Sequence, residues 1–130
     1  MATSRYLIDT NAAIDYLAEA IPEKGLVFLD EVIDNGYSIS VISRIELYAY
    51  SKLSEQDQVS LDIMIAQSSM LNINDAIIEQ TIKIRKTYKT KLPDAIIAAT
   101  AMVHNLVLIT RNLKDFDNIE GLEVINPHVL

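Results

Sequence analysis

Apolar residues along the chain alternate between short runs and longer stripes at helical spacing. The short runs that are typical of strands lie at 6–8, 37–42, 70–73, 106–109 and 122–125. The helical stripes predict helices over 11–20, 22–35, 43–53, from 54 onward, over 74–89 and over 94–104. Strands that alternate with helices through short turns predict an α/β domain, with three layers (α/β/α) around a short, mostly parallel central sheet.

Local signals support the boundaries of these elements. Asn35-Gly36 is a stop signal for the second helix, and Pro93 suits the first position of the helix over 94–104. That helix is apolar nearly all round, which favours a central, buried position. The run over 106–109 is continuously apolar, as expected for a strand inside a parallel sheet.

Length and composition place the chain among small globular domains. Its 130 residues fit a single domain over 1–130, and 50% of them are hydrophobic. The absence of cysteine excludes disulfides, thiolate metal sites and cysteine nucleophiles, and is compatible with the cytoplasmic location that we expect. No apolar segment approaches the roughly 20 residues of a membrane span.

The charge of the chain is acidic overall but uneven. A formal net charge of −7 argues against holding nucleic acid by bulk electrostatics, although an enzyme can still touch nucleic acid locally. The basic residues gather in one short stretch: Lys83, Arg85, Lys86, Lys89 and Lys91. This stretch is either the solvated face of its helix or a contact for phosphates, and the pattern leaves both readings open.

Carboxylates fall where a parallel sheet collects functional residues. Asp9 follows the first strand, Glu46 lies one turn into the helix after the second, Asp94 begins the buried helix and Asp115 follows the strand over 106–109. The ligand crevice of such a sheet lies beyond the carboxyl ends of its strands. Carboxylates gathered there repel unless protons or cations intervene, and oxygen-only clusters suit Mg²⁺ or Mn²⁺. A metal held there could activate water against a phosphodiester.

Each acid also has a purely structural interpretation. Asp9 could cap the first helix, and Ser43 with Glu46 forms a capping-box pattern. Asp94 stands where acids stabilise a helix dipole, and Asp115 could be an ordinary loop acid. The functional hypothesis depends on all four together. Elsewhere, we expect Asp15 and Glu19 to be solvated, His128 to be exposed, and neither His104 nor His128 to be catalytic.

Four segments in order resemble the motifs of PIN domains, and together they span nearly the whole chain. They are Leu7-Ile8-Asp9-Thr10-Asn11, Ser40-Val41-Ile42-Ser43-Arg44-Ile45-Glu46-Leu47, Leu92-Pro93-Asp94-Ala95-Ile96-Ile97-Ala98-Ala99-Thr100-Ala101, and Leu108-Ile109-Thr110-Arg111-Asn112-Leu113-Lys114-Asp115-Phe116. Chain length and motif style resemble the VapC-type toxins of toxin–antitoxin pairs. The resemblance implies a Mg²⁺- or Mn²⁺-dependent endoribonuclease that cleaves tRNA or ribosomal RNA, dimerises, and is held inactive by an antitoxin protein.

The resemblance also implies roles for individual residues. Asp9 and Asp94 would be the principal metal ligands, and Glu46 would complete the metal's shell or hold its water. Many relatives carry Asp where this chain has Asn112, so the fourth site falls to Asn112 as a neutral oxygen ligand or to Asp115. Further polar residues near the motifs are candidates for contacts to ligand or substrate: Thr10, Asn11, Ser43, Thr110, Arg111 and Asn112.

Two other function classes stay open at this point. The first is a PIN-like protein-binding module that has lost its chemistry, which the acidic balance and Asn112 favour and the retained acids oppose. The second is an aspartate-phosphorylating domain, since receiver and phosphatase folds also place acids after strands. The segment Asp9-Thr10-Asn11 lacks the paired Asp-x-Asp of the phosphatases, which makes this the weaker alternative.

Overall fold

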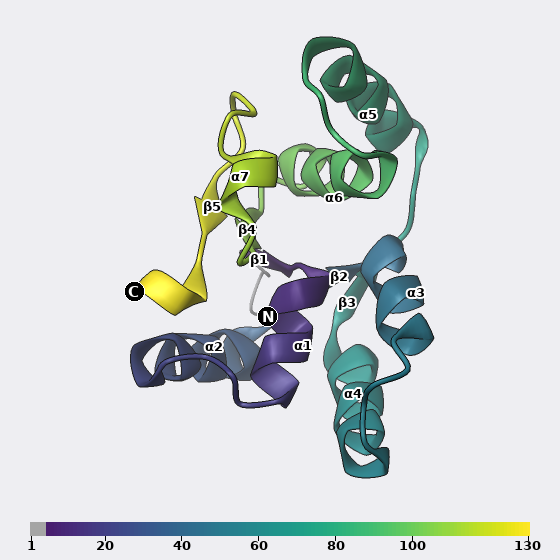
Figure 1. The fold of residues 1–130 in the computed structure, drawn as a ribbon. Coiled ribbons are helices and arrows are strands. Elements are labelled where there is room, and N and C mark those ends of the chain that lie inside the picture. Colours follow the sequence, from purple (N-terminus) through teal and green to yellow (C-terminus); the bar gives the residue numbers. More distant parts are fainter. Residues whose placement is uncertain (1–4) are drawn as a thin grey trace.

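The computed structural model describes residues 5–130 and shows a layered α/β domain (Figure 1). Its strands are β1 (Tyr6–Ile8), β2 (Ser38–Ser40), β3 (Ser69–Leu71), β4 (Val107–Ile109) and β5 (Val124–Ile125). Its helices are α1 (Thr10–Leu17), α2 (Glu23–Asn35), α3 (Val41–Ala49), α4 (Glu55–Gln67), α5 (Asp75–Thr87), α6 (Leu92–Val103), the short α7 (Leu113–Phe116) and the 3₁₀ helix η1 (Pro127–Val129).

The five strands form one sheet in the order β3-β2-β1-β4-β5, and every pair in it is parallel. The predicted mostly parallel sheet is therefore confirmed, and the sheet is parallel throughout. The first strand lies at its centre, where Leu7 pairs with Leu108 and with Ser38. Since all strands run the same way, their carboxyl ends meet at one edge of the sheet.

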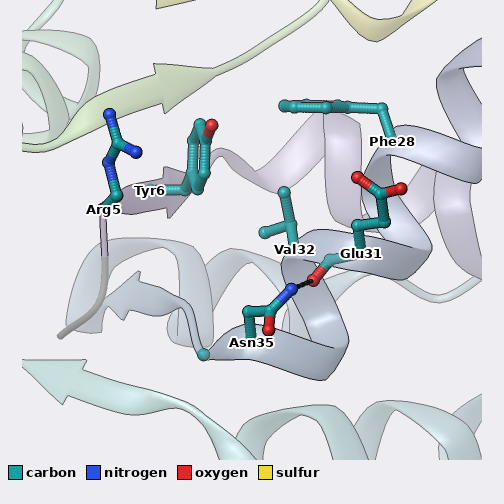
Figure 2. A pocket seen from close by; sticks show the side chains of 7 residues that line it. Arg5, Tyr6, Phe28, Glu31, Val32 and Asn35 are labelled. Carbon is teal, nitrogen blue, oxygen red and sulfur yellow. Dashed lines mark hydrogen bonds between the residues drawn. The ribbon is translucent and has the colours of Figure 1, made fainter. Parts of the chain in front are cut away.

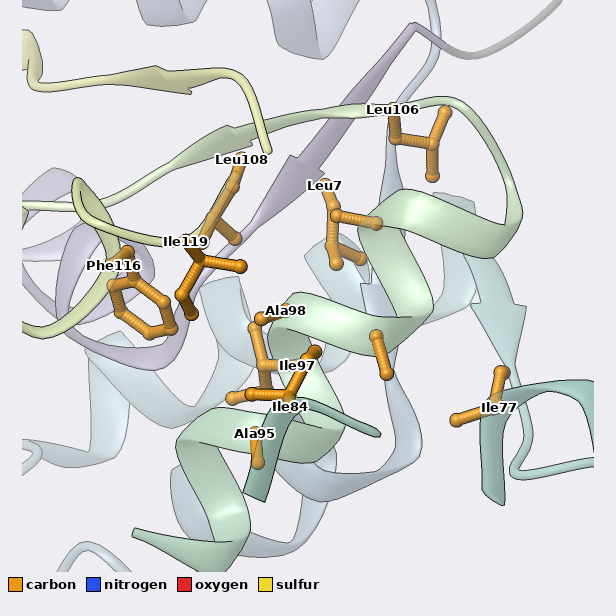
Figure 3. Packing of buried hydrophobic residues seen from close by; sticks show 12 residues of the cluster. Leu7, Ile77, Ile84, Ala95, Ile97, Ala98, Leu106, Leu108, Phe116 and Ile119 are labelled. Carbon is orange, nitrogen blue, oxygen red and sulfur yellow. The ribbon is translucent and has the colours of Figure 1, made fainter. Parts of the chain in front are cut away.

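Successive residues of the central strands enter two separate hydrophobic cores. Leu7 and Leu108 pack on one face against α5, α6 and α7 (Figure 3). Ile8, Ile39 and Ile109 pack on the other face against α1, α2 and α4. The alternation follows from the two-residue period of a strand, and strands buried on both faces are largely apolar, although β2 also buries Ser38 and Ser40.

The helix α6 is the central helix of its face, as its all-round apolar sequence predicts. Six of its residues are buried, and it packs against α5, α3, α7 and β4. It begins at Leu92, two residues before the predicted start, so that Pro93 and Asp94 both lie in its first turn. The start of this helix therefore carries an ionisable group into the carboxyl edge of the sheet.

Other boundaries differ from the predicted ones by a few residues. The first helix ends at Leu17 and not at 20, and α3 begins at Val41 and not at Ser43. The predicted strand over 37–42 is shorter because Ser40 caps α3, where its hydroxyl accepts a hydrogen bond from Ile42 N. The elements α7 and η1 were not predicted. Within residues 5–130, no helix has the length and apolar character needed to cross a membrane.

Candidate functional site

Asp9 lies at the carboxyl end of the central strand and begins α1 as its N-cap. Its side chain is 4% exposed. Asp9 Oδ1 accepts a hydrogen bond from Thr10 N at 2.8 Å, and Oδ2 accepts one from Thr110 Oγ1 at 2.8 Å. Burial nevertheless raises the pKa of Asp9 from 3.8 to about 6, against the lowering effect of these bonds and with a further rise from Asp94 and Glu46.

Asn11 and Thr110 join the ends of β1 and β4 around this carboxylate. Asn11 Nδ2 donates to Asp9 Oδ2 at 3.1 Å, and Asn11 Oδ1 accepts from Arg111 N at 3.0 Å. Thr110 is fully buried and its hydroxyl bonds Asp9 directly. Both residues therefore use their polar atoms to hold Asp9 and the loop after β4, a role that the sequence pattern did not distinguish from contact with substrate.

The capping box predicted from Ser43 and Glu46 is wrong. Ser40, not Ser43, caps α3, so Glu46 lies in the middle of the helix and has no free backbone N–H to bond. The Glu46 carboxylate is instead bonded to Thr10, with Oε1 2.6 Å from Thr10 Oγ1. Ser43 is buried, and its Oγ lies 3.0 Å from the same Thr10 oxygen.

Asp94 enters the same edge from the start of α6. Its pKa is raised first by burial and then by the charges of Asp115 and Glu46, while Lys91 opposes the rise. Glu46 acts electrostatically on both Asp9 and Asp94, and Asp115 acts on Asp94. The structure thus brings the four predicted acids, which are far apart in the sequence, into one mutually repelling group.

Asp115 and Asn112 differ in their relation to this group. Asp115 lies on α7 and is exposed, and its charge reaches Asp94. Asn112 is exposed at the start of α7, where its backbone N–H donates to Thr110 Oγ1 at 3.2 Å and its carbonyl accepts from Asp115 N at 3.2 Å, and its side chain does not cap the helix. Of the two candidates for the fourth position, Asp115 is therefore the one whose side chain interacts with another acid of the site.

Arg111 is engaged in an ion pair that the sequence did not predict. Its Nη1 lies 2.8 Å from Asp15 Oδ2 and 3.0 Å from Oδ1, and His128 Nε2 lies 3.0 Å from the same Oδ2. Asp15 is buried and His128 is partly buried, so the expectation that they are solvated and exposed is wrong. The cluster ties α1 to the loop after β4 and to η1, and leaves the Arg111 side chain 49% exposed.

The donor set at this edge fits a divalent cation. All four acids offer oxygen, none of them forms an ion pair within residues 5–130, and their mutual repulsion is what a cation would relieve. In that same part of the chain, no three acidic or histidine side chains already stand at metal-binding spacing. A group of carboxylates of this kind is compatible with Mg²⁺, which keeps several waters and is usually bound through one or two carboxylates.

A hollow at the other edge of the sheet lacks this chemistry. It has a volume of about 300 Å³ and lies between the amino-terminal end of β1 and α2 (Figure 2). Its lining includes Tyr6 and Phe28, whose rings meet edge to face with centroids 5.6 Å apart, together with Arg5 and Glu31. No acid of the site described above lines it, so the carboxyl edge is the candidate functional site.

Comparison with known proteins agrees with this reading of the fold and the motifs. The family model described as PIN domain matches residues 6–122. A toxin–antitoxin complex from Klebsiella pneumoniae contains a chain that is 36% identical, with a TM-score of 0.77 over 96% of this chain and 99% of that one. The structure of VapBC2 from Rickettsia felis bound to a DNA fragment from its promoter contains a chain that is 26% identical, with a TM-score of 0.77 over 93% and 97%.

A curated relative matches over a shorter stretch. Ribonuclease VapC1 from Rickettsia felis is 56% identical over 32 residues, which is 25% of this chain. The match spans only 24% of the length of that relative. It therefore supports a close local likeness, while the solved structures carry the likeness over the full length of the domain.

Proposed function

The chain belongs to the PIN-domain family, in its VapC-type group, and we propose that it is a Mg²⁺- or Mn²⁺-dependent endoribonuclease. The observation that carries this proposal is the convergence of Asp9, Glu46, Asp94 and Asp115 at the carboxyl edge of the sheet. Burial and the neighbouring acids raise the pKa of Asp9 and Asp94, and such carboxylates cost stability unless something uses them. Hydrolysis of a phosphodiester is a reaction that an oxygen-ligated divalent cation supports.

The side chains of the site have different roles in the proposed reaction. Asp9 and Asp94 would hold the cation, with Glu46 and Asp115 beside them. When bound, Mg²⁺ or Mn²⁺ lowers the pKa of water and offsets negative charge on a phosphodiester. Thr110 and Asn11 keep the Asp9 carboxylate in one orientation by direct hydrogen bonds. Cleavage would leave a 5′-phosphate on one product.

Basic residues near the acids supply contacts to the RNA backbone in this proposal. Lys91 lies close enough to Asp94 to lower its pKa, so the carboxy-terminal end of the basic stretch reaches the site. Arg111 is half exposed and is held by Asp15, which leaves part of its guanidinium open to a phosphate. The substrates that we propose are tRNA or ribosomal RNA, and the cell compartment is the cytoplasm.

We further propose that the protein is the toxin of a toxin–antitoxin pair, with a cognate antitoxin protein and a second copy of itself as partners. The solved relatives from Klebsiella pneumoniae and Rickettsia felis come from such complexes. Apolar side chains exposed on α3 and α5, among them Ile45 and Ile82, offer surface for protein contacts.

The proposal is tested by inducing the protein in bacterial cells without any partner, beside Asp94→Asn expressed at an equal soluble level. We expect the wild type to arrest growth and to produce discrete tRNA or rRNA fragments, and the variant to do neither. Retained cleavage by Asp94→Asn would refute the assignment of that residue. Intact RNA and normal growth with both proteins would count against the toxin function in that host.

One observation favours a second candidate, a protein-binding module without chemistry. Within the described residues, no three ligands are preassembled for a metal ion. Thermal unfolding in the presence of Mn²⁺ separates the two candidates. An upward shift of the unfolding temperature that vanishes in Asp9→Asn supports the enzyme, and no shift in the wild type supports the binding module.

A further inference from the structure

Thr10 is the residue that links two of the four acids. Its backbone N–H donates to Asp9 Oδ1 at 2.8 Å, and its side-chain Oγ1 lies 2.6 Å from Glu46 Oε1. Asp9 comes from the end of β1, whereas Glu46 comes from α3. A single residue at the start of α1 therefore sets where these two carboxylates stand relative to each other.

Glu46 depends on this contact for its orientation. It is exposed on α3, and within residues 5–130 Thr10 is the only hydrogen-bond partner of its side chain. A free glutamate on a helix surface samples several rotamers and loses that freedom only when its end is held. Because Thr10 holds Oε1, Oε2 is the carboxylate oxygen of Glu46 that has no hydrogen bond within residues 5–130.

The direction of the hydrogen bonds follows from the donor inventory. A carboxylate can only accept, and each hydroxyl has one proton to donate. The Thr10 hydroxyl therefore donates to Glu46, and Ser43, whose Oγ lies 3.0 Å away, donates to Thr10. Ser43 is 1% exposed, so its hydroxyl has no solvent partner to compete. These two hydrogen bonds, from Ser43 to Thr10 and from Thr10 to Glu46, keep the Thr10 hydroxyl proton directed toward the carboxylate.

We infer that Thr10 is a positioning residue, whose hydroxyl, supported by Ser43, orients the Glu46 carboxylate for a divalent cation held by Asp9 and Asp94. This inference rests on the proposed function. Residues that hold a metal-ligating side chain in place typically contribute about 10- to 100-fold to metal affinity or activity. Thr10 thus supports the reaction through Glu46 and not through contact with RNA.

The test replaces the hydroxyl with a methyl group of the same shape. For Thr10→Val, we expect the Kd for Mn²⁺, measured from the electron paramagnetic resonance signal of free Mn²⁺, to weaken about 10-fold. We expect kcat on a labelled single-stranded RNA oligonucleotide to fall about 10- to 100-fold. Thr10→Ser restores the hydroxyl and should recover most of both losses. Thr100→Val is the matched control, because that hydroxyl bonds only Ile96 O inside α6.

A double-mutant cycle shows whether Thr10 acts through Glu46. If it does, Thr10→Val adds less than about twofold to the effect of Glu46→Gln on either readout, because the group it orients is already altered. A general structural role would instead add its full effect in the double variant. Additive losses, or a Thr10→Val protein with wild-type Mn²⁺ affinity and kcat, would overturn the inference.

A second variant and the metal-binding data separate poor folding, failure of this inference and failure of the proposed function. If Thr10→Val folds poorly because the Ser43 hydroxyl is left buried without a partner, Thr10→Val/Ser43→Ala removes that hydroxyl and takes its place in the cycle. Mn²⁺ binding that depends on Asp9 and Asp94 but not on Thr10 would overturn the inference and leave the proposed function standing. A wild-type protein that neither binds Mn²⁺ nor cleaves RNA would overturn both.

Discussion

The Asp9 carboxylate shows how a single residue couples function to stability. Burial holds its pKa at about 6, above the 3.8 of a free side chain. Between these values the folded state keeps a proton that the unfolded state has released, so the free energy of unfolding falls as the pH rises through this window. Above about pH 6 the metal-free protein carries the full cost of a buried charge.

Asp9→Asn should therefore stabilise the metal-free protein while it removes metal binding. At pH 8 we expect the free energy of unfolding to rise by about 3 kcal/mol, because a pKa of about 6 in place of 3.8 corresponds to that energy at 1.36 kcal/mol per pH unit. Urea unfolding in the presence of EDTA measures this change. At pH 4 the two proteins should differ far less, and a less stable variant at pH 8 would show that the buried Asp9 charge does not destabilise the folded protein.

The fourth position of the site is decided by comparing Asp115→Asn with Asn112→Ala. The charge of Asp115 raises the pKa of Asp94, so Asp115→Asn should lower that pKa in an NMR titration of the Asp94 carboxyl group. It should also weaken Mn²⁺ binding in calorimetry about 10-fold. Asn112→Ala should leave both quantities near the wild-type values. A stronger effect of Asn112→Ala would place the fourth ligand at that residue.

At the scale of elements, the sequence predicts nearly every strand and helix. It does not predict which serine caps α3 or which residue the Glu46 carboxylate bonds. The pattern Ser43-Arg44-Ile45-Glu46 indicates a capping box because a serine precedes a glutamate by three residues. Ser40, three residues earlier, is the actual N-cap of α3, and its hydroxyl accepts a hydrogen bond from Ile42 N. Only the packing of α3 beside α1 shows that Glu46 bonds Thr10, which is distant in sequence.

The short carboxy-terminal elements were not predicted for a similar reason. The 3₁₀ helix η1 has no apolar period of its own, and it is held by contacts with α2 and by the bond between His128 and Asp15. These are long-range contacts, which a local pattern does not contain. The same holds for Asp15 and Arg111, whose pairing joins α1 to the loop after β4.

The contact between α2 and η1 makes a sharp prediction for Gly25. A Cβ at this position would lie 2.0 Å from Pro127 O and 2.5 Å from Ile21 Cγ2, so the backbone of η1 would have to move. We expect Gly25→Ala to lower the free energy of unfolding by about 2–4 kcal/mol, measured by urea denaturation. Unchanged stability would show that η1 does not pack on α2 as described.

At the scale of the whole molecule, the position of the site follows from the topology. The sequence predicts the parallel sheet, and the carboxyl-edge rule then gathers four acids that come from different elements. The rule does not predict which polar neighbours hold the acids, because that depends on side-chain distances across the edge. Thr10, Asn11 and Thr110 are candidates for contact with ligand or substrate, and the structure adds that each one bonds an acid of the site.

The uneven charge of the molecule makes a prediction for binding to RNA. With a net charge of −7, attraction must come from local cations such as Lys89 and Lys91. In the Asp94→Asn background, which prevents cleavage, we expect Lys89→Gln and Lys91→Gln each to reduce the salt slope of single-stranded RNA binding by about 0.7. Lys24→Gln on α2 is the matched control and should leave the slope unchanged. Equal slopes in all variants would exclude these lysines as phosphate contacts.

We propose that the acids at the carboxyl edge hydrolyse RNA with the help of a divalent cation. The most direct measurement incubates the purified protein with bacterial tRNA and rRNA, with Mn²⁺ or with EDTA, and maps the ends of the products by sequencing. We expect discrete fragments with 5′-phosphates from the wild type with Mn²⁺, and no such fragments with EDTA or from Asp94→Asn. Equal cleavage with EDTA, or equal cleavage by Asp94→Asn, would contradict this proposal.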